Sequence, residues 1–112
     1  MTRETKNRYL VRELRRIVRR LIHHYKPERI VLFGSMASGE TNRWSDIDLA
    51  IIKKTRRRFI HRLGDALIKA DPREAMDVVV YTPKEVQRME EERNPFWVHE
   101  IKIKGKTLYQ RA

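Results

Sequence analysis

The stretch from Ile30 to Ile52 constrains the fold more than any other part of the sequence. Its first run, Ile30–Phe33, consists of branched and aromatic residues and is typical of a buried strand. Gly34 and Ser35 follow directly, at a point where the backbone turns with little side-chain bulk. A polar loop then leads into a second strand-like run at 46–52. The pattern predicts two buried strands separated by a tight turn and a hydrated loop.

Two aspartates open the second run, at positions 46 and 48. Because strand side chains alternate between faces, Asp46 and Asp48 point the same way, while Ile47, Leu49 and Ile51 point into a core. The two aspartate Cα atoms are then about 6.6 Å apart. Carboxylates at this spacing can converge on one hard cation or on two bridged cations, whereas without a cation they would repel each other. The spacing therefore predicts a magnesium site.

A third carboxylate, Asp77, interrupts the strand-like run at 75–81. An aspartate among β-branched residues is costly unless it is paired or binds a metal. If this strand lies beside the one that carries Asp46 and Asp48, Asp77 completes a triad. The alternative is that Asp77 faces solvent on a half-exposed edge. Taken with the Gly-Ser turn and the Asp-x-Asp pattern, the sequence favours the triad.

These motifs together carry a resemblance to a known family. Gly34-Ser35, then Asp46-Ile47-Asp48-Leu49, then Asp77 on a later strand resembles the DNA polymerase β-like nucleotidyltransferase superfamily, from Ile30 to about Tyr109. Because the chain is short, it is most similar to the minimal nucleotidyltransferase (MNT) domain proteins of prokaryotes. The resemblance implies an α/β (α+β) fold, a small mixed β-sheet with helices packed on it. It also implies transfer of a nucleoside monophosphate, with ATP as the expected substrate.

The same resemblance assigns roles to the acidic residues and to the turn. Asp46, Asp48 and Asp77 are the expected catalytic residues and the ligands of two Mg²⁺ ions. Gly34 and Ser35 are expected to bind the β- and γ-phosphates, with residues 35–38 as a short helical turn.

Three further residues are candidates for nucleotide binding. The minimal family usually reads Gly-Ser-x-Ala-Arg-Gly, and here Ser38 stands where the family has arginine, which removes a cation that neutralises triphosphate charge. Arg43 in the following loop is a candidate to compensate. Trp44 either stacks on a nucleotide base or covers the end of the core.

The acceptor and the partners follow from the resemblance alone. An extra domain would be needed to grip a nucleic-acid duplex, so we expect a small acceptor or one presented by a partner. The minimal family is often paired with a HEPN-domain toxin and can act as its antitoxin by adding AMP to a tyrosine of that toxin. Two other functions stay open: a module that neutralises its partner by contact without catalysis, and a basic nucleic-acid-binding domain.

The net charge of +11 comes from two short segments. Residues 1–26 hold nine Lys/Arg against two Glu, hence +7, and residues 53–62 hold six against none, hence +6. Such surfaces attract polyanions. We favour the reading that they are solvated faces of amphipathic helices over a dedicated nucleic-acid site, with an acidic partner protein as a third option.

The remaining pattern predicts a single domain over 1–112, with an N-terminal amphipathic helix (1–26), a catalytic core (28–81) and C-terminal helices with a short strand (82–112). Thr82-Pro83-Lys84-Glu85 is a capping box that starts a helix, and a further helix ends at Gly105. The helix predicted at 57–70 takes its expected apolar face from a set of five residues, Phe59, Ile60, Leu63, Leu67 and Ala70. The chain has no cysteine and no apolar signal core, and no run approaches the length of a membrane span, so we expect a cytoplasmic protein without membrane association.

Overall fold

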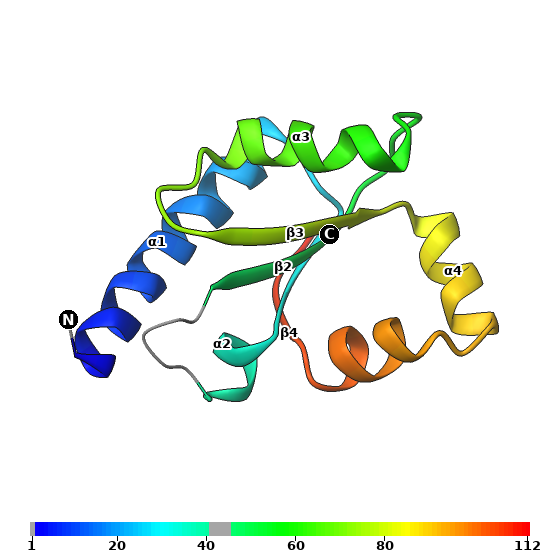
Figure 1. The fold of residues 1–112 in the computed structure, drawn as a ribbon. Coiled ribbons are helices and arrows are strands. Elements are labelled where there is room, and N and C mark those ends of the chain that lie inside the picture. The colour runs from blue at the N-terminus through cyan, green and yellow to red at the C-terminus, as the bar shows by residue number, and fades with distance from the viewer. Residues whose placement is uncertain (1, 41–45) are drawn as a thin grey trace.

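Four strands form one mixed sheet in the computed structural model, which describes residues 2–40 and 46–112 (Figure 1). The strands are β1 (Arg29–Phe33), β2 (Ile47–Ile52), β3 (Met76–Tyr81) and β4 (Lys106–Gln110), and their order is β3-β2-β1-β4. β1 pairs antiparallel with β2 and with β4, whereas β2 and β3 are parallel neighbours. The predicted α/β fold with a small mixed sheet is confirmed, and so is the short edge strand near the C-terminus.

Helices cover both faces of this sheet (Figure 1). They are α1 (Arg3–His24), α2 (Ser35–Ser38), α3 (Phe59–Ala70), α4 (Pro83–Glu91) and the π-helix η1 (Phe96–Ile103). One core cluster joins α1 and α3 to Ile47, Leu49 and Ile51 of β2. The other joins η1 and α4 to the opposite face of the same strand, at Ala50 and Ile52. The strand alternation predicted for 46–52 is therefore confirmed, and it leaves Asp48 on the face that η1 and α4 cover.

The N-terminal helix is amphipathic, as its sequence predicts, but it also buries a carboxylate. Glu13 is 5% exposed and accepts hydrogen bonds from Arg16 Nε at 2.7 Å and Arg16 Nη2 at 3.0 Å. It also accepts one from the backbone N–H of Arg73 at 2.5 Å. Arg16 Nη2 donates in turn to the backbone carbonyl of Asp71 at 2.6 Å. This network fastens α1 to the loop between α3 and β3.

Replacing Glu13 with Gln should destabilise the protein in a pH-dependent way. The hydrogen bonds from Arg16 hold the pKa of the Glu13 carboxyl below its usual value. Stability from a carboxyl with a lowered pKa is complete above its unfolded pKa and is lost as the pH falls through the folded pKa. We expect Glu13→Gln to cost about 1–3 kcal/mol at pH 7 and progressively less from about pH 5 to pH 3. Urea unfolding across this pH range measures the difference, and a gap that does not change with pH would contradict the assignment.

The buried face of α3 differs from the one that the sequence predicts. The residues of this helix that face the core are Arg62, Ala66 and Ala70, whereas Phe59, Ile60 and Leu63 are 50%, 68% and 45% exposed. The prediction was correct for Ala70 and wrong for these three apolar residues. Because Ala66 and Ala70 are small, the helix approaches the sheet closely, and the buried guanidinium of Arg62 finds hydrogen-bond acceptors there. The apolar flank of the helix therefore faces solvent.

Arg62 is stabilised by three acceptors from different elements. Its Nε donates to the Arg57 carbonyl at 2.8 Å, and its Nη1 donates to the Val80 carbonyl at 3.2 Å and to Glu85 Oε1 at 2.6 Å. The Glu85 carboxylate also closes the predicted capping box, because it accepts from the backbone N–H of Thr82 at 2.7 Å. Arg62 thus connects α3, β3 and the first turn of α4, which explains why a charged residue occupies a core position.

The C-terminal segment seals the second core. Trp97 and Ile101 of η1 are 0% and 1% exposed. Trp97 Nε1 donates to Glu90 Oε1 at 3.1 Å, so its polar atom is satisfied. The π-helical winding of this segment is not evident from its sequence.

Candidate active site

The Gly-Ser turn lies directly at the end of β1. Gly34 has φ 73° and ψ −155°, a conformation that essentially only glycine adopts, and α2 begins at Ser35. The amides of Ala37 and Ser38 both donate to the Gly34 carbonyl at 3.1 Å. Residues 35–38 therefore form the helical turn that the sequence predicts, and the earlier amides of the turn have no acceptor within it.

The turn also lies against Asp48, which explains a second requirement for glycine. A Cβ atom on Gly34 would stand 2.3 Å from Asp48 Oδ2 and 3.0 Å from its Cγ. No side chain fits in that space, so the backbone of the turn and the carboxylate are in direct contact. Sequence reasoning assigned Gly34 to the turn and to phosphate binding but not to contact with Asp48, because only the folded sheet brings the start of β2 beside the end of β1.

Asp48 lies between the turn and the third predicted carboxylate. In the sheet register it stands opposite Phe33 of β1 on one side and opposite Asp77 of β3 on the other. Burial, followed by the negative charges of Asp77 and Asp46 and a hydrogen bond with Asp77, raises the pKa of Asp48 to about 6. The two carboxyl groups from separate strands therefore meet, and both alternatives for Asp77 hold in part: it is exposed on an edge strand and in register with Asp48.

The metal assignment of all three aspartates remains a prediction. Asp46 is half-buried just before β2, close enough for its charge to raise the pKa of Asp48. Within residues 2–40 and 46–112, however, no three His, Cys, Asp or Glu side chains are arranged to hold a metal ion. The structure brings Asp48 and Asp77 together with Asp46 nearby, rather than forming a closed cage of three ligands.

The donor set nevertheless fits a hard divalent cation. It offers only carboxylate oxygens, which Mg²⁺ prefers, and the pKa of Asp48 is raised first by burial and then by the negative charges of Asp77 and Asp46, which a cation would neutralise. The glycine backbone packed against Asp48 leaves the carboxylate unshielded by a side chain on that side.

The other nucleotide-binding candidates are less well defined by the structure. The Ser38 hydroxyl donates to the Ser35 carbonyl at 3.2 Å and accepts from the Glu40 amide at 3.4 Å, so it is engaged in closing the turn. The predictions for Arg43 and Trp44 fall outside the described residues.

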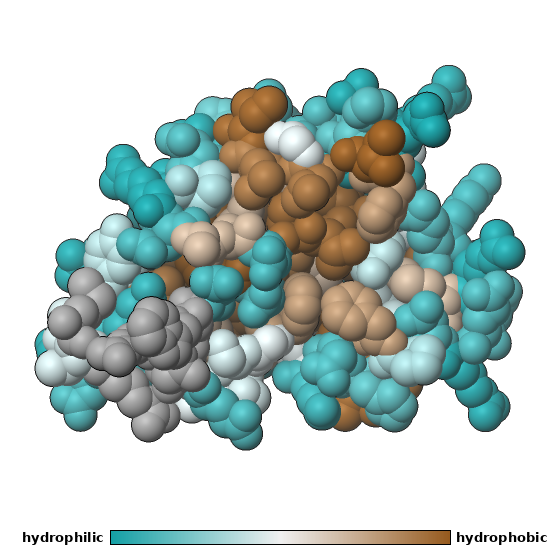
Figure 2. All heavy atoms as spheres, viewed as in Figure 1, coloured by the Kyte–Doolittle hydropathy of each residue, from teal (hydrophilic) through white to brown (hydrophobic). Residues whose placement is uncertain are grey.

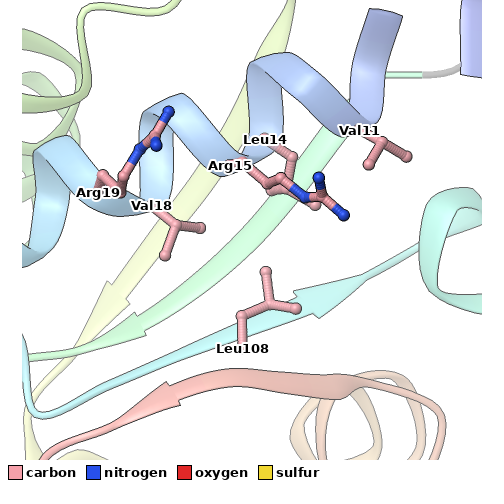
Figure 3. A pocket seen from close by; sticks show the side chains of 6 residues that line it. All are labelled: Val11, Leu14, Arg15, Val18, Arg19 and Leu108. Carbon is pink, nitrogen blue, oxygen red and sulfur yellow. The ribbon is translucent and has the colours of Figure 1, made fainter. Parts of the chain in front are cut away.

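A separate groove of about 430 Å³ lies between α1 and β4 (Figure 3). Its floor is apolar, and Leu108 of β4 points toward Leu14 and Val18 of α1. Arg15 and Arg19 line it as well, and they continue into an adjoining groove with Arg8 and Arg12. The basic segment at 1–26 is thus a solvated helix face next to an apolar hollow, away from the carboxylates.

Comparison with known proteins identifies the family and the fold. Residues 15–112 match the family model described as "Polymerase beta, Nucleotidyltransferase". The fold is similar to the crystal structure of a protein from Sulfolobus solfataricus that is regarded as a nucleotidyltransferase, with a TM-score of 0.70, 18% identity, and coverage of 99% of this chain and 89% of that one. No curated protein gives a significant match. In the described residues, no helix has the length and hydropathy needed to cross a bilayer.

Proposed function

Because the chain belongs to the polymerase β-like nucleotidyltransferase family, we propose that it transfers AMP from ATP to a hydroxyl group of a partner protein. The observation that carries the proposal is the meeting of Asp48, Asp77 and the Gly34 backbone at one point of the sheet. Carboxylates from two strands beside a glycine turn provide oxygen ligands and backbone amides together, which is the combination that phosphoryl chemistry requires.

In the proposed reaction the acceptor oxygen attacks the α-phosphorus of the nucleotide. A new phosphorus–oxygen bond forms, the bond from the α-phosphorus to the bridging oxygen of the anhydride breaks, and pyrophosphate leaves with that oxygen. The hydroxyl proton passes to a carboxylate oxygen of Asp77 and then to water. Asp77 suits this role because it is the exposed member of the pair, on the side from which an acceptor can approach.

The residues around the reacting atoms position the substrates. Asp46 and Asp48 would hold both Mg²⁺ ions, and Asp77 the ion next to the acceptor hydroxyl. When bound, these ions supply positive charge that neutralises the triphosphate and lowers the affinity of the hydroxyl for its proton. The backbone of Gly34 and Ser35 would orient the β- and γ-phosphates through the amides at the start of α2.

The acceptor that we propose is a tyrosine of a HEPN-domain toxin, which would make this protein an antitoxin. The support is the resemblance to minimal nucleotidyltransferases. One residue supports a non-catalytic alternative: Ser38 replaces the family arginine, and its hydroxyl is engaged within the turn. A protein that binds nucleotide weakly and neutralises its partner by contact is therefore the second candidate. The arginines beside the α1 groove support a nucleic-acid-binding role less well, because the floor of that groove is aliphatic and offers no ring for base stacking.

One incubation separates these functions. The protein is mixed with α-phosphate-labelled ATP, Mg²⁺ and the product of the adjacent gene, alongside the Asp46→Ala variant. We expect label on the neighbouring protein with the wild type and none with the variant. Tight binding of the two proteins without transfer of label would instead support the second candidate, a protein that neutralises its partner by contact. RNA or DNA binding that weakens steeply with salt and survives Asp46→Ala would favour the nucleic-acid domain.

A further inference from the structure

β3 lies at the edge of the sheet, and its backbone is open on the outer side. The Ala75 carbonyl accepts from the Ile47 amide at 3.2 Å, and the Tyr81 carbonyl accepts from the Lys53 amide at 2.9 Å. In a parallel pair both polar groups of a residue point to the same side, so the odd-numbered residues of β3 pair with β2. The polar groups of Met76, Val78 and Val80 therefore point outward, where no strand of the described chain pairs with them.

The open part of this edge is centred on Asp77. Arg62 Nη1 already donates to the Val80 carbonyl at 3.2 Å, so the end of the strand near Tyr81 is capped from within. The backbone groups of Met76 and Val78 remain, one on each side of Asp77. Exposed edges usually carry lysine, proline or a bulge that prevents pairing. β3 has none of these, its one charged residue is Asp77 itself, and its pairing with β2 runs in unbroken register.

An exposed apolar flank of α3 extends this edge. Ile60 and Leu63 are 68% and 45% exposed, on the opposite side of the helix from Asp65 and Lys69, and Ile68, on the solvent side, is 74% exposed. Figure 2 shows a continuous apolar surface where Figure 1 places α3 and β3. Contiguous apolar surface of this kind is uncommon on a protein that acts alone.

The charge around the edge indicates what covers it. At the C-terminal end of β3 a groove of about 370 Å³ is lined by Lys54, Thr55, Thr82, Pro83 and Lys84. A second copy of the chain would bring another +11 of charge to this surface, and the two copies would repel each other. An acidic segment of a different protein would be attracted.

We propose that the acceptor polypeptide binds as an extended strand added antiparallel to the edge of β3. The proposal rests on the proposed function and specifies how its substrate is presented. The backbone of Asp77 points toward β2, so the residue opposite Asp77 forms a non-hydrogen-bonded pair, in which Cα atoms are about 4.5 Å apart and the side chains are closest. A tyrosine at that position lies on the same face as Asp77, with its hydroxyl directed to the reacting phosphate. Apolar side chains of the segment cover the flank of α3, and acidic residues before the tyrosine meet Lys54 and Lys84.

Backbone-modified peptides test this arrangement. The probe is a peptide with one tyrosine, alternating valine and threonine around it, and glutamates at its N-terminal end. The residues on either side of the tyrosine are the ones whose amides would donate to β3. We expect N-methylation of those two amides to reduce AMP transfer at least about tenfold, and N-methylation of the tyrosine amide, which points outward, to leave transfer unchanged. Equal transfer to all three peptides would overturn the proposal.

Surface variants of α3 provide a second test within the protein. Ile60→Ser/Leu63→Ser removes apolar surface from the flank, and His61→Ser/Lys69→Ser makes serine replacements on the side of the helix away from that flank. We expect the first pair to raise KM for the peptide about fivefold or more, and the second pair to change it less than twofold. Release of AMP and pyrophosphate from ATP with water as acceptor should be the same in both. Equal KM values for the two pairs would mean that the flank does not contact the acceptor.

Failure of the strand model can be distinguished from failure of the enzyme. If AMP is transferred to the partner or to water and N-methylation of the peptide does not change transfer, the proposed enzymatic function stands and strand addition is rejected. If neither AMP transfer nor ATP cleavage occurs, hydrogen exchange still tests whether the peptide binds at the edge of β3. Added peptide should slow exchange of the Met76 and Val78 amides, and unchanged exchange would reject the strand model.

Discussion

Replacing Asp48 with Asn should abolish AMP transfer and, in the absence of metal, make the protein more stable. Loss of a carboxylate that holds the reacting groups is expected to reduce turnover by at least about a thousand-fold. The same carboxylate is half-buried next to Asp77, and its pKa is raised to about 6. It is therefore a residue whose charge opposes folding, which is the expected signature of a side chain retained for function rather than for stability.

The stability change should depend on pH with a defined sign. A carboxyl with a raised pKa binds its proton more tightly in the folded state, so its contribution to stability falls as the pH rises from 3.8 to about 6. Asparagine stays neutral and avoids this loss. We expect Asp48→Asn to match the wild type near pH 4 and to exceed it by about 1–3 kcal/mol above pH 7.

Urea unfolding in EDTA at several pH values, combined with label transfer in Mg²⁺, measures both effects. Glu91→Gln on the exposed side of α4 is the matched control, and it should change neither quantity appreciably. An Asp48→Asn protein that is less stable at pH 7.5 would show that the carboxylate is structural. An Asp48→Asn protein that still transfers AMP would show that the Asp48 carboxylate takes no part in the reaction.

Local patterns predicted the strands and helices of this chain well. Alternation placed Ile47, Leu49 and Ile51 in one core, and the capping box at Thr82 and Glu85 marked the start of α4. These features depend on neighbours within a few residues, so the sequence contains them directly.

Features that depend on three-dimensional neighbours were harder to predict. Whether Asp77 adjoins Asp48 depends on β3 lying next to β2, and a strand between them was equally compatible with the connection. The face of α3 was mispredicted because hydrophobicity alone ranks Ile60 above Arg62, whereas the acceptors that make Arg62 a core residue come from β3 and α4. Two of the misassigned apolar residues, Ile60 and Leu63, are part of the surface that we propose for binding.

Replacing Gly34 with Ala should damage both the fold and the site. The backbone conformation there is unfavourable for any residue with a side chain, and the added methyl group would stand 2.3 Å from Asp48 Oδ2. We expect a loss of about 2–5 kcal/mol in the free energy of unfolding, and loss of AMP transfer because the turn or the carboxylate must move. Gly39→Ala is the control: Gly39 also has positive φ, at 80°, but nothing lies within 4 Å of its added Cβ. It should cost about 1 kcal/mol and leave transfer intact.

A double-mutant cycle separates the two causes in Gly34→Ala. Asp48→Ala removes the carboxyl atoms that the new methyl group would strike, while the backbone conformation at position 34 is unchanged. In that background Gly34→Ala should cost less, by about 1–3 kcal/mol, because only the backbone strain remains. An unchanged cost would mean that the contact with Asp48 does not limit this position. A reduced cost would show that glycine at 34 is required so that the turn and the Asp48 carboxylate can touch, which is the geometry on which the proposed transfer depends.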